Sequence, residues 1–388
     1  KTAAMLRSVR VPALKLSRAM ALQTTVIGSF PKPEYVNIPD WFRTGTGGDS
    51  KKATEEYTKI LETQTDGEKE KLEADLMRAT DEIISIQTEC GVDIVTDGEV
   101  RRENYIHFLC RFIEGIDFKN LTEKSVRNGA YTTSLPTIRG KVSWRGGLDV
   151  VAEWKKAQAV SKAPVKYTIP GPMTIIGTLH NAFYDEEKDL AIDLAKIVNA
   201  HVVALAEAGC KHIQVDEPVF ARQPEKALQW GIGLLDKCFE GVGKEVVKSM
   251  HMCCGYPEYL DQVGYKKAEP SSYFKLAEAL DRSSVDAISI EDAHRNNDLS
   301  LLQKFKQTSI IFGAVKIASS DVETVEEIED RLTEALNYID AERLIVAPDC
   351  GLALLPLPIL KEKLSNMCQA AKNCGCKRPK KKQRLCPF

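Results

Sequence analysis

The chain has 388 residues, of which 43% are hydrophobic and 28% are charged, and its formal net charge at pH 7 is −2. This is the composition of an ordinary globular protein, and the small net charge argues against general binding to nucleic acid. No apolar run approaches the roughly 20 residues that a membrane-spanning helix needs, so we expect no membrane association. The 11 cysteines are scattered, which favours free or metal-bound thiols in a reducing compartment over a disulfide framework.

Both ends of the chain are basic. Residues 1–23 carry lysines and arginines and no acidic residue, with serines and small apolar residues between them. This pattern is typical of a mitochondrial transit peptide, and a disordered basic extension is the alternative. The expected location is therefore the cytoplasm, or the mitochondrion if the segment is a transit peptide. Residues 373–388 contain the run KRPKKK, which predicts a solvated basic tail.

Short apolar segments rich in β-branched residues follow one another between these ends. They are 24–30 (TTVIGSF), 92–99 (VDIVTDGE), 165–173 (VKYTIPGPM), 212–218 (HIQVDEP), 248–255 (KSMHMCCG), 286–292 (DAISIED), 309–317 (SIIFGAVKI) and 344–352 (LIVAPDCGL). The segments between them are long enough for helices. Two of these, 72–86 and 190–205, carry apolar residues at steps of three and four, as amphipathic helices do.

This alternation predicts an α/β protein, a (β/α)8 TIM barrel over residues 24–372. The long stretches 31–91 and 101–164 are expected to be loops and helices inserted at the rim of the barrel. An open doubly wound sheet is disfavoured, because Gly28 stands alone and no glycine-rich dinucleotide fingerprint follows the first strand.

Polar residues gather at the C-terminal ends of the expected strands. They are Ser29, Asp97, Glu99, Asp216, Glu217, His251, Cys253, Glu291 and Cys350. In a TIM barrel this end of the strands carries the chemistry, so these residues are the candidates for the functional site.

The pair His251 and Cys253 predicts a metal site. Residues i and i+2 of a strand point to the same side, so the imidazole and the thiol converge while Cys254 turns away. Glu291 and Cys350 end two other strands and can reach the same place. One nitrogen, two thiolates and one carboxylate oxygen make a tetrahedral set for Zn2+, although Glu291 could equally bind a substrate amine or a neighbouring cation.

With these motifs in order, the chain resembles the cobalamin-independent methionine synthase family, specifically its catalytic barrel. The matching stretches are "TTVIGSFP", "DGE", "GPMTI", "IQVDEP", "HMCCG", "ISIE" and "APDCGL", and the resemblance runs from about Thr24 to about Ala371. It implies that His251, Cys253, Glu291 and Cys350 bind zinc. It also implies methyl transfer from 5-methyltetrahydrofolate to homocysteine, which makes the chain an S-methyltransferase of methionine biosynthesis.

The resemblance further implies which residues bind the amino acid. The positions that hold homocysteine in the family correspond to Ile27, Ser29, Glu99 and Asp216. The two carboxylates suit the ammonium group of the substrate, whereas Ser29 and nearby backbone N–H groups suit its carboxylate.

The side of the site that would bind the methyl donor departs from the family. Arg222 stands where the family has a glutamate that contacts the pterin, and Ala318 stands where a histidine is thought to assist proton delivery. A tryptophan-containing segment of the family is replaced by GTLHNAF, and His180 or His294 would have to compensate. Family members usually carry a second barrel that helps to bind the folate, and the resemblance covers only the catalytic one. The identity of the donor is therefore left open.

Three other functions remain as alternatives. A zinc-dependent thiol alkyltransferase of the same superfamily would use a corrinoid protein, coenzyme M or a sulfonium compound with a related small thiol. A metal-binding protein without catalysis would bind no thiol. Uroporphyrinogen decarboxylase-like chemistry shares the fold but leaves the four metal-site residues unexplained.

Overall fold

The computed structural model describes residues 21–40, 50–126 and 131–376. The predicted basic extension lies outside these residues except for its last three positions, and the run KRPKKK lies wholly outside them. The division into extension, barrel and tail therefore stays a prediction, although the last helix continues to Cys376 and so passes the barrel end expected at residue 372.

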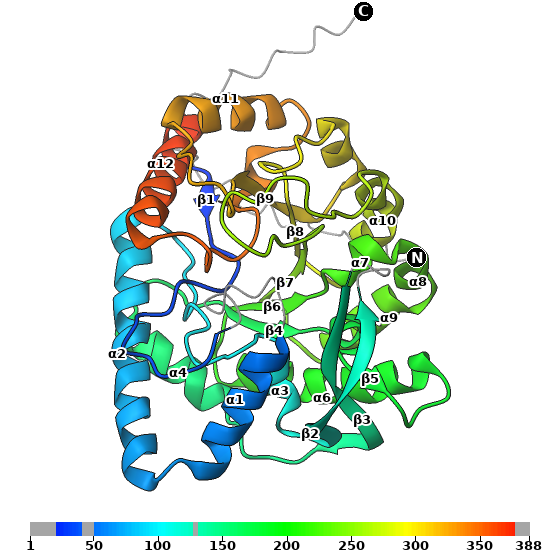
Figure 1. The fold of residues 1–388 in the computed structure, drawn as a ribbon. Coiled ribbons are helices and arrows are strands. Elements are labelled where there is room, and N and C mark those ends of the chain that lie inside the picture. Colours follow the sequence, from blue (N-terminus) through cyan, green and yellow to red (C-terminus); the bar gives the residue numbers. More distant parts are fainter. Residues whose placement is uncertain (1–20, 41–49, 127–130, 377–388) are drawn as a thin grey trace, which may run out of the picture.

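The core of the fold is a parallel sheet that curls into a barrel (Figure 1). Its strands are β1 (Gln23–Thr24), β4 (Tyr167–Pro170), β6 (His212–Asp216), β7 (Val247–Met252), β8 (Ala287–Ile290), β9 (Ser309–Val315) and β10 (Leu344–Pro348). Neighbours pair in the order β1-β10-β9-β8-β7-β6-β4. The expected second strand fills the remaining gap, because Ile94 bridges to Thr25 and Val95 bridges to Val165, both in parallel. The predicted TIM barrel is confirmed.

Side chains help to close the barrel where the backbone ladder is short. Gln87, which is fully buried, pairs with Thr96 much as a strand would: its Nε2 donates to Thr96 O at 2.8 Å, and Thr96 N donates to its Oε1 at 2.9 Å. The carboxylate of Asp93 accepts hydrogen bonds from N and Oγ1 of Thr24, each at 2.8 Å. These contacts satisfy backbone groups that would otherwise be buried without partners.

Helices pack around the outside of the strands (Figure 1). The longer ones are α1 (Ser50–Thr63), α2 (Asp66–Cys90), α4 (Val150–Val160), α6 (Glu187–Glu207), α10 (Ser271–Asp281), α11 (Val325–Ala335) and α12 (Leu357–Cys376). The shorter ones are α3 (His107–Cys110), α5 (Pro172–Gly177), α7 (Val219–Arg222), α8 (Pro224–Lys226), the π-helical turn η1 (Ala227–Gly231), α9 (Ile232–Cys238), η2 (Leu299–Lys304) and η3 (Ala341–Arg343).

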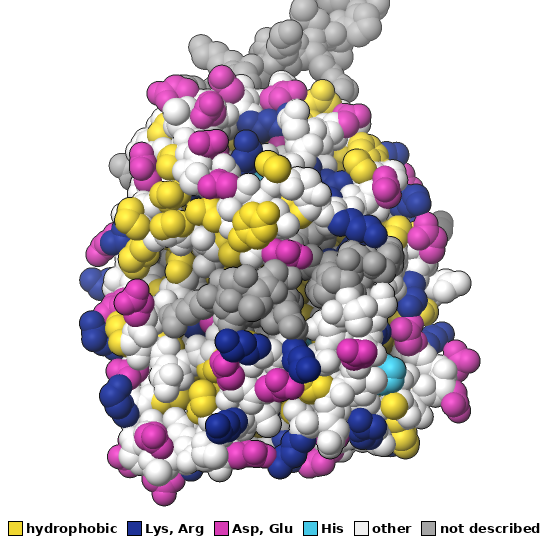
Figure 2. Space-filling view, in the orientation of Figure 1, with side chains coloured by type: hydrophobic (Ala, Val, Ile, Leu, Met, Phe, Trp, Pro, Cys, Tyr) yellow, Lys and Arg dark blue, Asp and Glu magenta, His cyan; other side chains and the backbone are white. Residues whose placement is uncertain are grey.

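The two helices expected from periodicity are both present, as α2 and α6. Thr65 and Glu68 form a capping box at the start of α2, and Gly91 ends it with a φ of 93°, a conformation that glycine adopts without strain. None of the helices in the described ranges is both long and apolar enough to cross a membrane. Acidic and basic side chains are interspersed over the face seen in Figure 2, in agreement with the small net charge.

The stretch 101–164 contains a feature that the sequence did not predict. Instead of only loops and helices, it forms a long antiparallel hairpin of β2 (Ile113–Val126) and β3 (Tyr131–Trp144), to which β5 (His180–Asn181) adds a short third strand. The expectation of loops and helices was wrong here. The pairing register shifts twice along the hairpin, and these irregularities disrupt the alternation of polar and apolar residues by which a strand is recognised.

We predict that Gln87→Met lowers the stability of the fold by about 2–4 kcal/mol, because it leaves the buried N–H and C=O groups of Thr96 without partners. The midpoint of thermal unfolding, followed by circular dichroism, measures the effect. Gln369→Met is the control, since Gln369 is exposed on α12 and, among the described residues, its side chain bonds to Asn373 alone. Equal midpoints for the two variants would show that Gln87 does not help to close the barrel.

Candidate active site

A cavity of about 400 Å³ opens at the C-terminal ends of the strands. Among the predicted site residues, those that line it are Ile27, Ser29, Glu99, Asp216, His251, Cys253 and Cys350. The hairpin contributes Lys124, Ser125, Thr133 and Leu135 to the same cavity. The strand ends and the inserted hairpin therefore enclose one space, and the predicted acceptor and metal residues share it.

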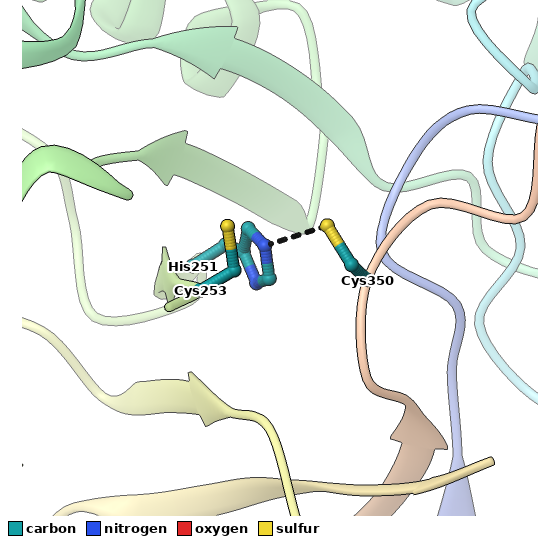
Figure 3. Close-up of side chains that lie close together, drawn as sticks. All are labelled: His251, Cys253 and Cys350. Atoms are coloured by element: carbon teal, nitrogen blue, oxygen red, sulfur yellow. Dashed lines mark hydrogen bonds between the residues drawn. The ribbon is translucent and has the colours of Figure 1, made fainter. Parts of the chain in front are cut away.

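His251, Cys253 and Cys350 form a cluster of potential metal ligands (Figure 3). One ligand atom from each residue lies within 4.8 Å of the others, and His251 Nε2 is 3.3 Å from Cys350 Sγ. His251 is the second-last residue of β7, and its Nδ1 lies 2.9 Å from the hydroxyl of Ser289 on the neighbouring strand β8. This contact orients the ring so that Nε2 faces the cysteines, as a partner on the second ring nitrogen does in metal sites.

The two thiols influence each other strongly. Hydrogen bonding from Cys350, together with His251, holds the pKa of the Cys253 thiol well below its ordinary value despite burial. The same hydrogen bond and burial raise the pKa of Cys350 well above its ordinary value. The pair therefore readily carries one negative charge, and a bound divalent cation would favour ionisation of both thiols.

Glu291 lies beside this cluster without belonging to it. It is buried behind the end of β8, its Oε1 accepts a hydrogen bond from Cys254 N at 2.9 Å, and it does not line the cavity. Its Oε2 is buried and has no hydrogen-bond partner among the described residues. Burial and the neighbouring Cys253 raise the pKa of Glu291 to about 7. An unpaired carboxylate oxygen next to two thiols fits a soft divalent metal such as zinc, which would supply the missing partner.

Two carboxylates face the cavity from other strands. Asp216 ends β6, and burial raises its pKa to about 7. Glu99 adopts a left-handed backbone conformation with a φ of 55°, which is uncommon for a residue with a side chain and often accompanies functional sites. Its Oε1 accepts a hydrogen bond from Thr168 Oγ1 at 2.7 Å and forms an ion pair with Arg102 Nη1 at 3.4 Å. Glu99 is therefore already paired with a cation, whereas the side-chain hydrogen bond that Asp216 accepts comes from the neutral amide of Gln214.

Ser29 connects the first strand to the loop that carries Cys350. Its carbonyl accepts a hydrogen bond from Leu352 N at 2.7 Å. A Cβ atom at Gly351 would clash with Ser29 Oγ, so a larger residue would force the Ser29 side chain to move. The predicted substrate residue Ser29 and the predicted ligand Cys350 are thereby held side by side.

Two of the polar strand ends have structural roles instead. The carboxylate of Glu217 accepts hydrogen bonds from Met173 N and from N and Oγ1 of Thr174 at 2.8–3.0 Å, and so caps α5. Asp97 accepts a hydrogen bond from Glu99 N at 3.0 Å and thus supports the turn that presents Glu99. Neither side chain lines the cavity.

The residues expected to differ from the family on the donor side lie in different places. Arg222 lines the cavity, and within the described ranges its side chain makes no hydrogen bond or ion pair. Ala318 is buried away from the cavity, and its carbonyl accepts a hydrogen bond from Asp261 N at 2.8 Å. His294 Nε2 accepts hydrogen bonds from Ile317 N and Ala318 N at 3.1 and 3.3 Å. Neither His294 nor His180 lines the cavity, so neither replaces the family histidine there.

Several residues of the cavity were not found from the sequence. They include Arg102, Tyr105, Trp230 and Tyr256, as well as the four hairpin residues. Trp230 belongs to η1 and supplies an aromatic side chain from outside GTLHNAF, the segment in which the resemblance predicts a tryptophan. No local pattern marks such residues, because they reach the cavity only through the packing of loops and insertions.

Comparisons with known proteins agree with these observations. The family described as "Cobalamin-independent synthase, Catalytic domain" matches residues 22–373. The methionine synthase of Sulfolobus acidocaldarius is 31% identical over 349 residues, which cover 89% of this chain and 90% of that protein. That of Saccharolobus solfataricus is 31% identical over 363 residues, covering 92% and 96%. The structure of a B12-independent methionine synthase from Shewanella sp. W3-18-1, in complex with selenomethionine, has a TM-score of 0.77 at 28% identity and covers 91% of this chain and 98% of its own.

We predict that the purified protein binds about one zinc ion per chain and that Cys253→Ser and Cys350→Ser each lose most of it, because a thiolate contributes a large share of the binding energy in such a site. Elemental analysis of dialysed protein measures the metal. Cys254→Ser is the matched control, since Cys254 is the adjacent buried thiol but lies outside the cluster. Retention of zinc by Cys253→Ser, or its loss from all three variants, would contradict the assignment.

Proposed function

Because the chain belongs to the cobalamin-independent methionine synthase family and is therefore a methyltransferase, we propose that it transfers a methyl group to the thiol of homocysteine and so forms methionine. The observation that carries this proposal is the cluster of one imidazole and two thiols in the same cavity as Asp216 and Glu99. The cluster suits a sulfur atom, and the carboxylates suit an amino group. The Shewanella relative was solved with selenomethionine, the selenium analogue of the proposed product.

We propose that His251, Cys253, Cys350 and Glu291 hold zinc. Zinc bound there would lower the pKa of the substrate thiol and hold it as a thiolate. Cys253 and Cys350 would contribute two negative charges and so neutralise most of the charge of a divalent ion. This leaves the substrate sulfur electron-rich, which favours attack on a methyl group. Histidine- and carboxylate-rich sites instead acidify water for hydrolysis.

The remaining predicted residues would bind the amino acid part of homocysteine. Asp216 would pair with the ammonium group, and this pairing would stabilise its ionised form against the effect of burial. Glu99 would add a weaker attraction because Arg102 already neutralises part of its charge. Ser29 and the backbone near Ile27 would hold the carboxylate. A thiol without an amino group has no use for the two carboxylates, which favours homocysteine over coenzyme M.

The choice of methyl donor depends on whether the cavity can supply a proton to the leaving group. Methyl transfer forms a carbon–sulfur bond to the acceptor and breaks the bond to the donor, whose leaving atom keeps the electron pair. A nitrogen leaving group such as that of 5-methyltetrahydrofolate then needs a proton. Besides the proposed ligand His251, His107 lines the cavity, but burial lowers the pKa of His107 to about 3, so it carries no proton to donate from an imidazolium near neutral pH. The leaving groups of sulfonium compounds and of methylated corrinoid proteins need no such proton. A donor of this kind is therefore the second candidate beside the folate.

The test of the function is a methylation assay with homocysteine and a panel of donors, with the product identified by mass spectrometry. We expect methionine from a sulfonium or corrinoid donor, and slow or undetectable turnover with 5-methyltetrahydrofolate, because a missing general acid costs roughly 10²–10⁴-fold in rate. Rapid turnover with the folate would contradict the prediction about the donor. The proposed function would be contradicted if zinc-loaded protein methylated homocysteine with none of the donors.

We predict that Asp216→Asn weakens homocysteine binding roughly 10- to 100-fold, since a charge-assisted hydrogen bond contributes about 1.5–3 kcal/mol. Binding of propanethiol, which has no amino group, should change little. Titration calorimetry of the zinc-loaded protein measures both. Glu217→Gln is the control, because Glu217 is the next residue but caps α5 outside the cavity. Equal weakening of the two thiols by Asp216→Asn would mean that Asp216 has only a structural role.

A further inference from the structure

A buried chain of hydrogen bonds runs through the barrel interior to Asp216. The ammonium of Lys166 donates to Val26 O and to Gln214 Oε1, each at 2.6 Å. The amide nitrogen of Gln214 donates to Asp216 Oδ1 at 2.7 Å and to Ile27 O at 3.0 Å. The side chains of Lys166, Gln214 and Asp216 are all buried. One glutamine therefore contacts two of the residues that are proposed to bind homocysteine.

Lys166 determines which way the amide of Gln214 points. An ammonium group has donors only, so it requires the carbonyl oxygen of Gln214 to face it. The NH2 group must then face Asp216 and Ile27, both of which offer acceptors. Turning the amide over would place NH2 against the ammonium and the carbonyl against a carboxylate. With Lys166 protonated, the orientation seen is thus the only one that satisfies all three partners.

Burying the charged end of a lysine inside a barrel costs free energy. The interior of such barrels is usually filled by branched apolar side chains, and here Ile27, Ala287, Ile311 and Ala347 form an apolar cluster. Burial lowers the pKa of Lys166 to about 7, against the opposing charges of Asp216 and Glu99. An apolar residue would avoid this cost, but it would leave the amide of Gln214 free to turn.

We propose that Lys166 and Gln214 are positioning residues for the acceptor: they hold Oδ1 of Asp216 and the carbonyl of Ile27, and leave the other oxygen of Asp216 for the substrate ammonium. The proposal rests on the proposed function, since it assumes an acceptor with an amino group. Asp216 lines the cavity, whereas Gln214 and Lys166 do not. Their effect on the ligand is therefore transmitted through Asp216 and Ile27.

The positioning role predicts a change in selectivity, which a structural role does not. Gln214→Met keeps the approximate size of the side chain but removes both hydrogen bonds from its amide nitrogen. We expect the dissociation constant for homocysteine to rise about 10-fold or more, as the loss of a hydrogen bond to a charged group implies. That for propanethiol, which does not need Asp216, should stay nearly the same. In the methylation assay KM for homocysteine should rise more than kcat falls.

The experiment measures both dissociation constants by titration calorimetry, together with zinc content and the midpoint of thermal unfolding. Gln87→Met is the matched control, because Gln87 is also a fully buried glutamine with backbone partners and lies outside the cavity. It should lose stability without any change in selectivity between the two thiols. If Gln214→Met does not fold, Lys166→Met is the second variant. It should weaken the binding of homocysteine but not that of propanethiol.

The outcomes separate this inference from the proposed function. Zinc-loaded wild-type protein that does not bind homocysteine would overturn both. Normal binding by the wild type, with equal weakening of the two thiols in Gln214→Met or in Lys166→Met, would overturn the positioning role alone. The same selective loss in Gln87→Met would also overturn it, because the effect would then reflect general loosening of the barrel.

Discussion

The site depends on the parallel register of three neighbouring strands. Asp216 on β6 lies opposite His251 on β7, and His251 lies opposite Ser289 on β8. Because side chains alternate along a strand, residues paired at one level point to the same side of the sheet. The proposed counter-charge for the substrate, a proposed metal ligand and the hydroxyl that orients this ligand are therefore brought together by backbone pairing. A shift of one residue in β7 would turn the imidazole away from Asp216 and from Cys350.

The parts of the fold that could be predicted are those that repeat along the chain. Strand-to-helix units recur, and each of the eight expected strands appears in the barrel, the second only as two isolated bridges. The convergence of His251, Cys253 and Cys350 follows from the fold, because the C-terminal ends of parallel strands meet at one mouth. The hairpin could not be predicted in this way, since its register shifts and its partner surfaces come from distant segments.

The role of Glu291 can be predicted only in part from its position at the end of a strand. Its place at the end of β8 brings it near the cluster, but the direction of a carboxylate depends on rotatable bonds and on nearby donors. Here Cys254 N holds Oε1, and Oε2 has no partner among the described residues. Gln214 illustrates the opposite case. Nothing in its local sequence suggests a role, which becomes visible only when the contacts of Lys166 and Asp216 are known.

The proposed acceptor and donor halves of the reaction are built from different parts of the fold. On the proposed acceptor side, the thiols, the carboxylates and the buried network behind Asp216 are arranged by the barrel strands. Elsewhere the cavity is lined by the hairpin, by Arg222 of α7 and by Trp230 of η1, which lie outside the barrel strands. Such segments can change without disturbing the register of the strands. The proposed acceptor chemistry can therefore be kept while the proposed donor pocket changes. Arg222, whose side chain makes no hydrogen bond or ion pair within the described residues, is the charged cavity residue at which the resemblance predicts a departure from the family.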